Sequence, residues 1–461
     1  MKKDLAYAPV NIWDSADMNT RRIMEKFASQ YISFISSCKT ERETVEYVYN
    51  RLKEHGFSQD TGTDRIVRSL RGKAIFAARR GSVPLQEGLA LLAAHADTPR
   101  LDFKQRPFVE QPSVVQAKTH YYGGIRKYQW LARPLALHGV IVRENGEVLP
   151  VTIGEKSSEP VFCIADLLPH LAQKQVTQTV KDAFEAEKLN IILGHSSMSV
   201  SAAKSAPKEP IKAQLLEILY KKYGVREEDF ITAELQAVPA GAARFVGFDK
   251  ALVGGYGQDD RICVFTALES LLAAEAKGRT MAVMFWDKEE IGSDGATGAA
   301  SRFLQYCIED LVRAWGTNVS VSQTFLKTQA ISADVQAALD PDYQDLHEKQ
   351  NAAVLGYGPC FSKFTGSRGK YGASEADAEF FCALRSLFNQ KGIPWQAAEL
   401  GKVDQGGGGT VALFLAAYGM NVIDLGPAVL SMHSPFELAS CADIRSSFQA
   451  YKAFLESRAL L

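Results

Sequence analysis

The stretch MAVMFWDKEEIGSDG, from Met281 to Gly295, decides the fold and the chemistry of this chain. Its first six residues are apolar and are typical of a buried strand, and the charged run Asp287 to Glu290 follows directly. The adjacent carboxylates Glu289 and Glu290 repel each other, and burial disfavours their charged forms. In open α/β sheets, ligands bind outside the carboxyl ends of the strands. The stretch therefore predicts one carboxylate on a cation and its neighbour moving protons, with a solvated acidic turn as the alternative.

Length and composition restrict the class of protein. The chain has 461 residues, which predicts two or more domains, and its 46% hydrophobic and 23% charged residues are typical of a soluble globular protein. The 52 basic and 53 acidic residues leave a net charge of -1, which gives no electrostatic argument for nucleic acid or an anionic membrane as a partner. The opening residues have no apolar core after their two lysines and are not expected to form a signal peptide, and no apolar run is long enough to span a bilayer. The 7 cysteines are dispersed without a C-x-x-C pair, so we expect reduced thiols in a cytoplasmic protein.

Helical and strand patterns alternate at both ends of the chain. Helices are expected over 18–38, 40–55, 262–276, 299–314, 374–390, 411–418 and 448–457, and strands over 69–80, 89–94, 281–286, 328–333 and 421–425. Between 101 and 247 short alternating stretches replace this pattern, with one clear helix over 211–223 and a polar loop over 196–210. We therefore predict an α/β domain from 1–100 and 248–461, with a mostly parallel sheet covered by helices on both faces, and a β-rich domain inserted over 101–247.

Five positions carry an acidic residue or a histidine just after an apolar strand or at the start of a helix. They are His95 with Asp97, Asp259 with Asp260, Glu289 with Glu290, Asp334, and His433. Such a set suits a two-metal hydrolase centre, because oxygen and imidazole ligands bind Zn, Co or Mn and a carboxylate can bridge two ions. A free carboxylate beside the bridging water can pass its proton to the leaving amine. Structural alternatives remain open at each position: a core histidine at 95, a helix N-terminus at 259–260, an N-cap at 334 and a surface residue at 433.

Five motifs together resemble the aspartyl aminopeptidase family of metallopeptidases (the M18 family), which includes the vacuolar aminopeptidase. They are HADTP (His95 to Pro99), YGQDDR (Tyr256 to Arg261), DKEEIGS (Asp287 to Ser293), SAD (Ser332 to Asp334) and MHSPFE (Met432 to Glu437). The resemblance covers essentially the whole chain. It implies a zinc-peptidase-like catalytic domain carrying an inserted domain that mediates dimer formation, with the dimers building a tetrahedral dodecamer.

The resemblance also implies a role for each member of the set. The implied ligands of two divalent ions, Zn before Co or Mn, are His95, Asp259 and Asp334 for one ion and Asp259, Glu290 and His433 for the other. A metal-bridging hydroxide would attack the peptide carbonyl with Glu289 as general base and acid, and Asp97 would support His95. In related folds the bond after the bridging aspartate is often cis, which here is Asp259–Asp260.

Two further residues match substrate-binding positions of the family. Leu168 to Leu171 (LPHL) resembles a stretch whose histidine reaches a neighbouring subunit's active site, although its flanks differ, so His170 would bind the tetrahedral intermediate. Lys363 stands where aspartyl aminopeptidases place a basic residue that receives an acidic side chain, but the following TGSRGKYG departs from the acidic-specific pattern. A helix-end histidine and a solvated loop lysine are the alternatives, and an acidic or a neutral preference stays open.

We expect a cytoplasmic di-metal aminopeptidase that releases single residues from peptides with a free N-terminus. A di-metal deacylase or amidase on N-acylated substrates, and a self-assembling shell protein with vestigial peptidase activity, remain as alternatives. The glycine run Gly406 to Gly409 lacks the Gly-Lys-Ser/Thr ending of a phosphate loop, and no Gly-x-Ser-x-Gly elbow is present. Nucleotide binding and serine hydrolase chemistry are therefore unsupported.

Overall fold

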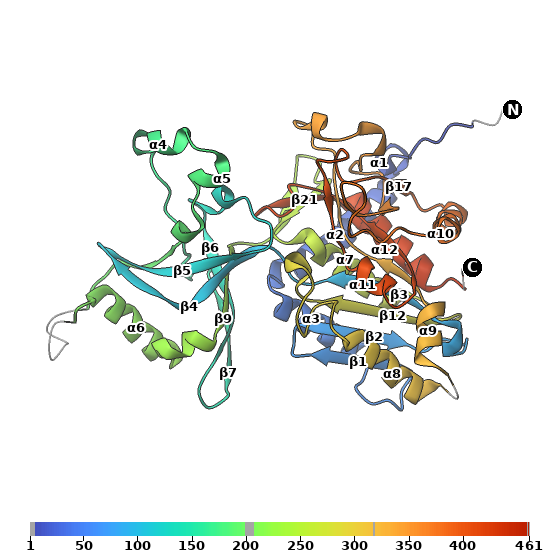
Figure 1. Ribbon diagram of the computed structural model, residues 1–461, viewed down its shortest axis with the longest axis horizontal. Helices are drawn as coiled ribbons and strands as arrows, with labels where there is room; N and C mark the ends of the chain where they lie inside the picture. The colour runs from blue at the N-terminus through green and yellow to red at the C-terminus, as the bar shows by residue number, and fades with distance from the viewer. Residues whose placement is uncertain (1–4, 199–206, 317–318, 459, 461) are drawn as a thin grey trace. The chain divides into compact units, whose positions relative to one another are not determined.

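The chain forms two compact units. The computed structural model describes residues 5–198, 207–316, 319–458 and 460 (Figure 1). Unit 1 comprises residues 1–97, 243–432 and 437–461, and unit 2 comprises residues 98–242 together with the short segment 433–436. The chain thus enters unit 2 a second time, for only four residues, between the last strands of unit 1.

Unit 1 is built on an eight-stranded sheet in the order β1-β2-β12-β3-β13-β19-β15-β17 (Figure 1). The strands are β1 (Arg65–Leu70), β2 (Ala74–Arg79), β3 (Leu89–His95), β12 (Thr280–Trp286), β13 (Gln329–Ser332), β15 (Cys360–Ser362), β17 (Gln396–Ala397) and β19 (Asn421–Gly426). The central strands β12, β3, β13 and β19 pair in parallel, whereas β1, β2 and β15 pair antiparallel with their neighbours toward the centre. The sheet is therefore mixed, and the prediction of a mostly parallel sheet is not confirmed. A turn of three residues, 71–73, joins β1 to β2 and is too short for a parallel crossover.

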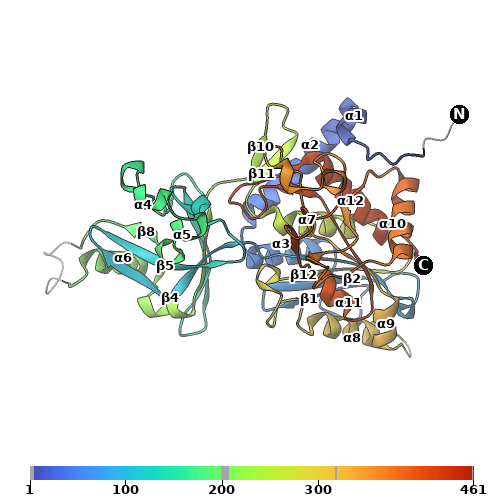
Figure 2. The same ribbon diagram turned by 45° about the horizontal axis from the view of Figure 1, so that its top comes forward.

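Helices cover both faces of this sheet (Figure 2). One face packs against α2 (Met18–Ser37), α3 (Glu41–Glu54), α7 (Gln258–Ala273), α10 (Ala378–Lys391) and α12 (Cys441–Leu455). The other face packs against α8 (Phe303–Trp315), α9 (Val321–Lys327) and α11 (Ala412–Ala416). A strand buried on both faces has to be apolar at every position, which is what the runs of β3 and β12 show.

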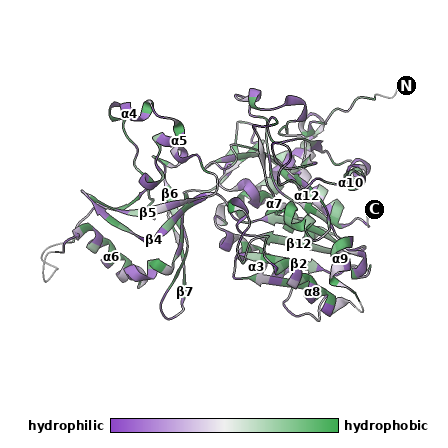
Figure 3. Ribbon diagram, in the orientation of Figure 1, coloured by the Kyte–Doolittle hydropathy of each residue, from purple (hydrophilic) through white to green (hydrophobic). Residues whose placement is uncertain are grey.

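Alternate residues of β12 belong to different apolar clusters. Met281, Val283 and Phe285 pack with the helices of the first face. Met284 and Trp286 pack with the helices of the second face. Figure 3 shows that β12 and its neighbouring strands are largely hydrophobic. This double burial places the carboxyl end of β12 firmly between two helical layers.

Several predicted elements differ from the observed ones at their ends. Thr40 is confirmed as an N-cap, because its hydroxyl accepts the Glu43 N–H at 3.2 Å in a reciprocal capping box. The last helix starts at Cys441 rather than at 448, since the Ser440 side chain caps it. The glycine run contributes a short strand, β18 (Gly407–Gly408), which pairs with β16 (Gly366–Ser367).

A second, five-stranded sheet of unit 1 leads into the candidate site. Its order is β10-β11-β21-β20-β14, with strands β10 (Arg244–Val246), β11 (Leu252–Gly255), β14 (Gln336–Ala337), β20 (Ala428–Leu430) and β21 (Glu437–Ser440). Strand β11 runs directly into α7, and β21 follows the segment 433–436. A short helix, α1 (Ile12–Ser15), precedes α2.

Unit 2 contains an antiparallel sheet of six strands in the order β7-β6-β9-β4-β5-β8. They are β4 (Arg100–Gln111), β5 (Val114–Tyr122), β6 (Leu135–Val142), β7 (Val148–Ile153), β8 (Ile191–Gly194) and β9 (Glu234–Pro239). Helix α6 (Pro210–Tyr223) packs on β4, β5 and β8, and α4 (Gln173–Val176) and α5 (Val180–Ala183) are single turns. Most of the loop predicted over 196–210 lies outside the described residues.

Candidate metal centre

His95 ends β3 and is surrounded by acidic groups. Its imidazole is 1% exposed, and Nδ1 lies 3.1 Å from the Asp97 carbonyl oxygen and 3.3 Å from Asp97 Oδ1. Because a carbonyl oxygen can only accept, Nδ1 is the donor to Asp97, and Nε2 is left for other contacts. Nε2 lies 3.2 Å from Asp259 Oδ1 and 3.9 Å from both Glu289 Oε2 and Asp334 Oδ1.

Parallel strand pairing brings these residues together. Strand β3 lies between β12 and β13, so their carboxyl ends meet at one edge. His95 pairs in register with Trp286, and the Ala333 N–H donates to the Ala93 carbonyl at 2.6 Å. The segment after β12 begins at Asp287, and the segment after β13 contains Asp334. Both segments therefore leave the sheet beside His95.

Asp97 joins His95 to the Glu289–Glu290 turn. Its buried carboxylate accepts the N–H of Glu289 at 3.1 Å and the N–H of Glu290 at 3.2 Å. The turn begins at Lys288, whose φ of 72° is left-handed, and continues as the 3₁₀ helix Glu289–Ile291. Asp97 was predicted only to support His95, and the structure adds this second contact.

The peptide bond between Asp259 and Asp260 is cis, which confirms the sequence-based expectation. Asp260 is fully buried, and its Oδ2 accepts the backbone N–H of His95 at 3.3 Å. Sequence reasoning assigned no role to this side chain. It links the residue after the predicted bridging ligand to the strand that carries His95.

Glu437 is a second acidic residue whose contacts were not anticipated. Its buried carboxylate accepts the N–H groups of Gln258 at 2.5 Å and Asp259 at 3.3 Å. The only sequence signal for this residue was its place as the last letter of the MHSPFE motif.

His433 belongs to the segment 433–436 of unit 2. Its Nδ1 lies 3.0 Å from the Gly124 carbonyl oxygen, so Nδ1 is the donor in this hydrogen bond. A Cβ on Gly124 would lie 3.2 Å from this Nδ1, which favours glycine there. The neighbours Met432 and Glu437 belong to unit 1. The role of His433 as a metal ligand stays a prediction.

Burial and mutual contact shift the pKa values of these groups. Burial lowers the pKa of His95, but hydrogen bonds to Asp259 and Asp97 outweigh it and hold the pKa well above 6.5. Burial, followed by the charge of Asp260, raises the pKa of Asp334 well above its ordinary value. Burial likewise raises the pKa of Asp260. The raised pKa values of His95, Asp260 and Asp334 indicate a site with more acidic groups than one imidazole can balance in charge.

The donor chemistry of the site fits a metal ion. Ligand atoms of His95, Asp260 and Asp334 lie within 4.8 Å of one another, and so do those of His95, Glu289 and Glu290. Carboxylate oxygens and an imidazole nitrogen, with no thiolate among them, are donors that suit zinc and similar divalent ions. A cation would also neutralise the acidic groups that burial disfavours.

The two predicted substrate residues lie elsewhere in the chain. Lys363 follows β15 in unit 1 with an exposed side chain, and its carbonyl accepts the Ala376 N–H at 2.8 Å. His170 is exposed in a 3₁₀ turn, Pro169–Leu171, of unit 2. No contact described for Lys363 involves a predicted metal ligand, and both assignments stay predictions.

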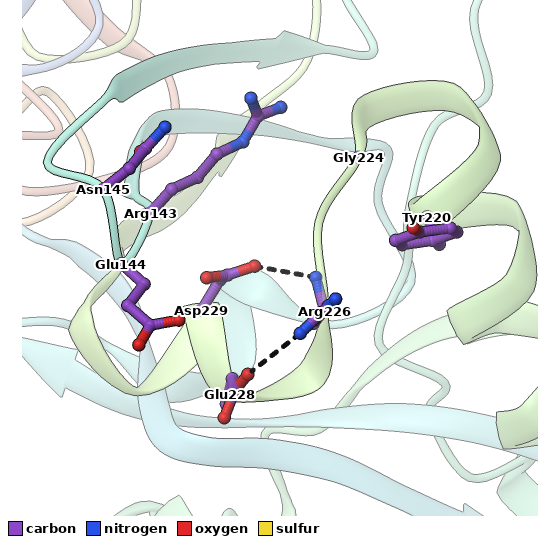
Figure 4. A pocket seen from close by; sticks show the side chains of 8 residues that line it. All are labelled: Arg143, Glu144, Asn145, Tyr220, Gly224, Arg226, Glu228 and Asp229. Atoms are coloured by element: carbon purple, nitrogen blue, oxygen red, sulfur yellow. Dashed lines mark hydrogen bonds and ion pairs between the residues drawn. The ribbon is translucent and has the colours of Figure 1, made fainter.

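A pocket of about 500 Å³ lies within unit 2 (Figure 4). It is lined by Arg143, Glu144, Asn145, Tyr220, Gly224, Arg226, Glu228 and Asp229. Charged groups at its wall pair with each other, as Arg226 does with Glu228 at 3.8 Å. None of the predicted site residues lines it, so it offers no support for the predicted chemistry.

Comparison with known proteins identifies the family. The model of the aminopeptidase I zinc metalloprotease family (M18) matches residues 34–455. This chain belongs to the M18 family. The resemblance inferred from the five motifs is thereby confirmed, and the chain is a metalloaminopeptidase, a hydrolase that acts on peptides.

Curated and solved relatives extend along the whole chain. A probable M18 family aminopeptidase 1 of Clostridium acetobutylicum is 42% identical over 99% of this chain and 100% of its own length, and one of Thermotoga maritima is 44% identical over 97% and 98%. The crystal structure of the Thermotoga maritima M18 aminopeptidase aligns with a TM-score of 0.92 at 43% identity, covering 98% of this chain and 100% of the other. No helix among the described residues is long and apolar enough to cross a lipid bilayer.

Proposed function

We propose that this M18 enzyme releases single N-terminal residues from peptides at a centre of two divalent ions. The proposed ligands are His95, Asp259 and Asp334 for the first ion and Asp259, Glu290 and His433 for the second. The observation that carries the proposal is the cluster around His95 Nε2, where three carboxylate oxygens lie at 3.2 to 3.9 Å. The family description as a zinc metalloprotease supports zinc as the ion.

When bound, two divalent ions would supply Lewis acidity toward the peptide carbonyl and lower the pKa of a nearby water. The chain itself supplies the proton transfers. Glu289 Oε2 takes a proton from the attacking water and delivers it to the nitrogen of the leaving amine. Its side chain is 16% exposed, so water and substrate can reach it, while its backbone is held by Asp97.

The MHSPFE motif and its hydrogen bonds support His433 as a ligand of the second ion. Glu437 follows the four-residue segment that contains His433, and it hydrogen-bonds to the backbone of Asp259. The Gly124 carbonyl accepts from His433 Nδ1, and a hydrogen bond of this kind on one ring nitrogen is common among metal-binding histidines.

The proposed reaction is tested by a panel of aminoacyl-anilides and dipeptides with Asp, Glu, Leu, Lys or Ala at the first position. Zn, Co, Mn or a chelator is added to separate samples. Chelator-sensitive release of acidic residues supports the proposal and Lys363 as the base of the pocket. Release of neutral residues keeps the mechanism and removes that role of Lys363. Turnover confined to N-acylated substrates would contradict it and favour the deacylase.

We further propose that unit 2 mediates dimer formation and that dimers build a tetrahedral dodecamer. A solved structure of the S. cerevisiae mApe1 dodecamer shares the fold, with a TM-score of 0.75 at 20% identity. In unit 2 the segment around His170 exposes apolar side chains, namely Leu167, Leu168, Leu171, Val176 and Val180. Such exposure is typical of a surface that another subunit covers.

His170 is proposed to act in a neighbouring subunit's site. Subunits carrying His170→Ala and subunits carrying Glu289→Gln are unfolded and refolded together. If His170 acts in the neighbour, mixed oligomers regain activity that neither variant has alone. No regain, with a mixed oligomer shown by mass, would contradict the assignment. We also propose that the enzyme is located in the cytoplasm.

A further inference from the structure

A buried clamp holds the start of α7 to the start of β21. Both the Gln258 N–H, at 2.5 Å, and the Asp259 N–H, at 3.3 Å, donate to one atom, Glu437 Oε2. In return, Gln258 Nε2 donates to the Glu437 carbonyl oxygen at 2.6 Å. We call these three hydrogen bonds the Glu437 clamp. It joins residues that lie about 180 positions apart in the chain.

The clamp is closed to water. Glu437 is 1% exposed and Gln258 is 0% exposed. The first N–H groups of a helix have no partner within the helix, so those of α7 depend on an acceptor from outside. A carboxylate in a buried setting is a stronger acceptor than a neutral group. Loss of Glu437 would leave these donors without a partner where water cannot replace it.

Gln258 is itself held on both sides. Its Nε2 also donates to the Val253 carbonyl at 3.1 Å, and its Oε1 accepts the Tyr31 hydroxyl at 3.4 Å. The amide therefore has a fixed orientation. The clamp is thus anchored to β11 and to α2 as well as to β21.

The clamp connects two segments that carry proposed ligands. Asp259 is the proposed bridging ligand, and His433 lies only four residues before Glu437. We propose that Glu437 is a positioning residue that sets the affinity of the second ion, the one assigned to Asp259, Glu290 and His433, more than that of the first. This inference rests on the proposed two-metal function, because it assigns a task to a residue outside the ligand set.

The expected selectivity follows from the connections of each segment. Asp259 belongs to both proposed ligand sets, but the other two ligands of the first ion, His95 and Asp334, come at the ends of β3 and β13 in the large sheet and not next to the clamp. The segment 433–436 has no strand or helix of its own and is attached to unit 1 at Met432 and Glu437. Releasing the clamp therefore disturbs two proposed ligands of the second ion, Asp259 and His433, but only one of the first, Asp259.

Three variants distinguish a role of Glu437 in binding the second ion from a general effect on folding. Glu437→Met keeps the approximate length of the side chain but accepts no strong hydrogen bond. Glu437→Gln keeps one carbonyl oxygen, which can accept both N–H groups because they donate to a single atom in the wild type. Asp443→Asn is the matched control, since Asp443 is also a fully buried carboxylate that accepts two backbone N–H groups, from Gly356 and Gly358, each at 2.7 Å.

The experiment is equilibrium dialysis of each full-length protein against buffers of stepped free Zn²⁺ concentration. Bound zinc per subunit is measured by mass spectrometry, and melting temperature is recorded in parallel. We expect two ions in the wild type and a second ion in Glu437→Met that needs about tenfold or more free zinc, as for other residues that orient metal ligands. Glu437→Gln and Asp443→Asn should both bind two ions as the wild type does.

Other outcomes overturn the inference. The inference is wrong if Glu437→Met binds zinc as the wild type does, or if Glu437→Met binds both ions more weakly by the same factor. It is also wrong if Glu437→Gln loses as much zinc affinity as Glu437→Met. If Glu437→Met does not fold, Gln258→Met tests the same clamp: a weaker second ion supports the inference, and unchanged binding overturns it. Failure of the two-metal proposal itself is seen separately, as a wild type that holds fewer than two ions while fully active.

Discussion

Each unit buries a histidine next to acidic side chains, and the two surroundings differ. In unit 2, His138 on β6 is 2% exposed, and its Nε2 lies 2.9 Å from Glu155 Oε1. Glu155 also accepts the Gly241 N–H at 3.1 Å, which ties β6 to a loop. In unit 1, His95 has carboxylate oxygens of Asp97, Asp259, Glu289 and Asp334 within 3.9 Å.

This difference separates a histidine paired with one glutamate from the proposed metal ligand. A histidine and a glutamate can balance each other's charge, so the pair around His138 is complete without a ligand. The group around His95 has more acid than the imidazole can balance, and burial makes that excess costly. The excess of buried carboxylates, rather than the burial of the histidine, therefore distinguishes the candidate metal centre.

The largest expected effect comes from removing each histidine in turn. His95→Ala should lose zinc and reduce kcat/KM by more than about 100-fold, since even residues that only orient ligands cost 10–100-fold. His138→Ala should keep its zinc and most of its activity. Metal content and kcat/KM are measured for both proteins. Similar losses in the two variants would break the comparison.

The next effect concerns the proton transfer. Glu289→Gln should reduce kcat by about 10²- to 10⁴-fold, because general acid–base groups contribute that much. Zinc content should stay at the wild-type value, since Glu289 is proposed as a base and not as a ligand. Loss of zinc together with activity would move Glu289 into the ligand set.

In unit 2 the expected effect is on stability. Glu155→Gln should lower the free energy of unfolding by about 2 kcal/mol, the usual size for a hydrogen bond to a charged partner. The rate of peptide hydrolysis measured per folded oligomer should not change. Urea unfolding combined with a zinc assay tests this expectation. A fall in zinc affinity would show that His138 is more than structural.

The smallest expected effect is on the pH dependence of stability. It concerns Asp443, a buried carboxyl group for which no metal ion is proposed. Burial raises the pKa of Asp443 to about 7, against the hydrogen bonds from Gly356 and Gly358. Because the pKa is raised in the folded state, Asp443 makes its full contribution to the free energy of unfolding of the wild type below about pH 4. This contribution is lost as the pH rises toward 7. Asp443→Asn does not ionise, so its stability relative to the wild type should rise by about 1 kcal/mol per pH unit between pH 5 and 7. Thermal melts across this range measure it, and a pH-independent difference would contradict the shifted pKa.

Much of the candidate metal centre could be predicted because its residues follow strong local signals. The apolar runs of β3 and β12 predict buried strands, and the residues after them, His95 and Glu289, fall at the edge where parallel strands end. The cis bond at Asp259–Asp260 was expected from the family resemblance alone. The edges of the sheet were mispredicted, because the strand pattern over 69–80 does not reveal that β1 and β2 form a hairpin.

The supporting carboxylates could not be predicted in the same way. Asp260 and Glu437 accept backbone N–H groups, and such an acceptor leaves no pattern in the sequence around its donor. The donors lie 165 and 178 residues away, respectively. The sequence also gives no sign that residues 433–436 belong to unit 2. That assignment depends on contacts with residues more than 300 positions earlier in the chain.

The hydrogen bond between Gly124 and His433 limits how far this enzyme can be reduced. Unit 2 could be excised by joining residue 97 to residue 243, which would leave every proposed metal ligand in the chain. The excision would nevertheless remove the Gly124 carbonyl, which accepts from His433 Nδ1. The imidazole would then lose the acceptor that fixes Nδ1 as a donor. A minimal catalytic unit would therefore need a replacement acceptor built into its new linker.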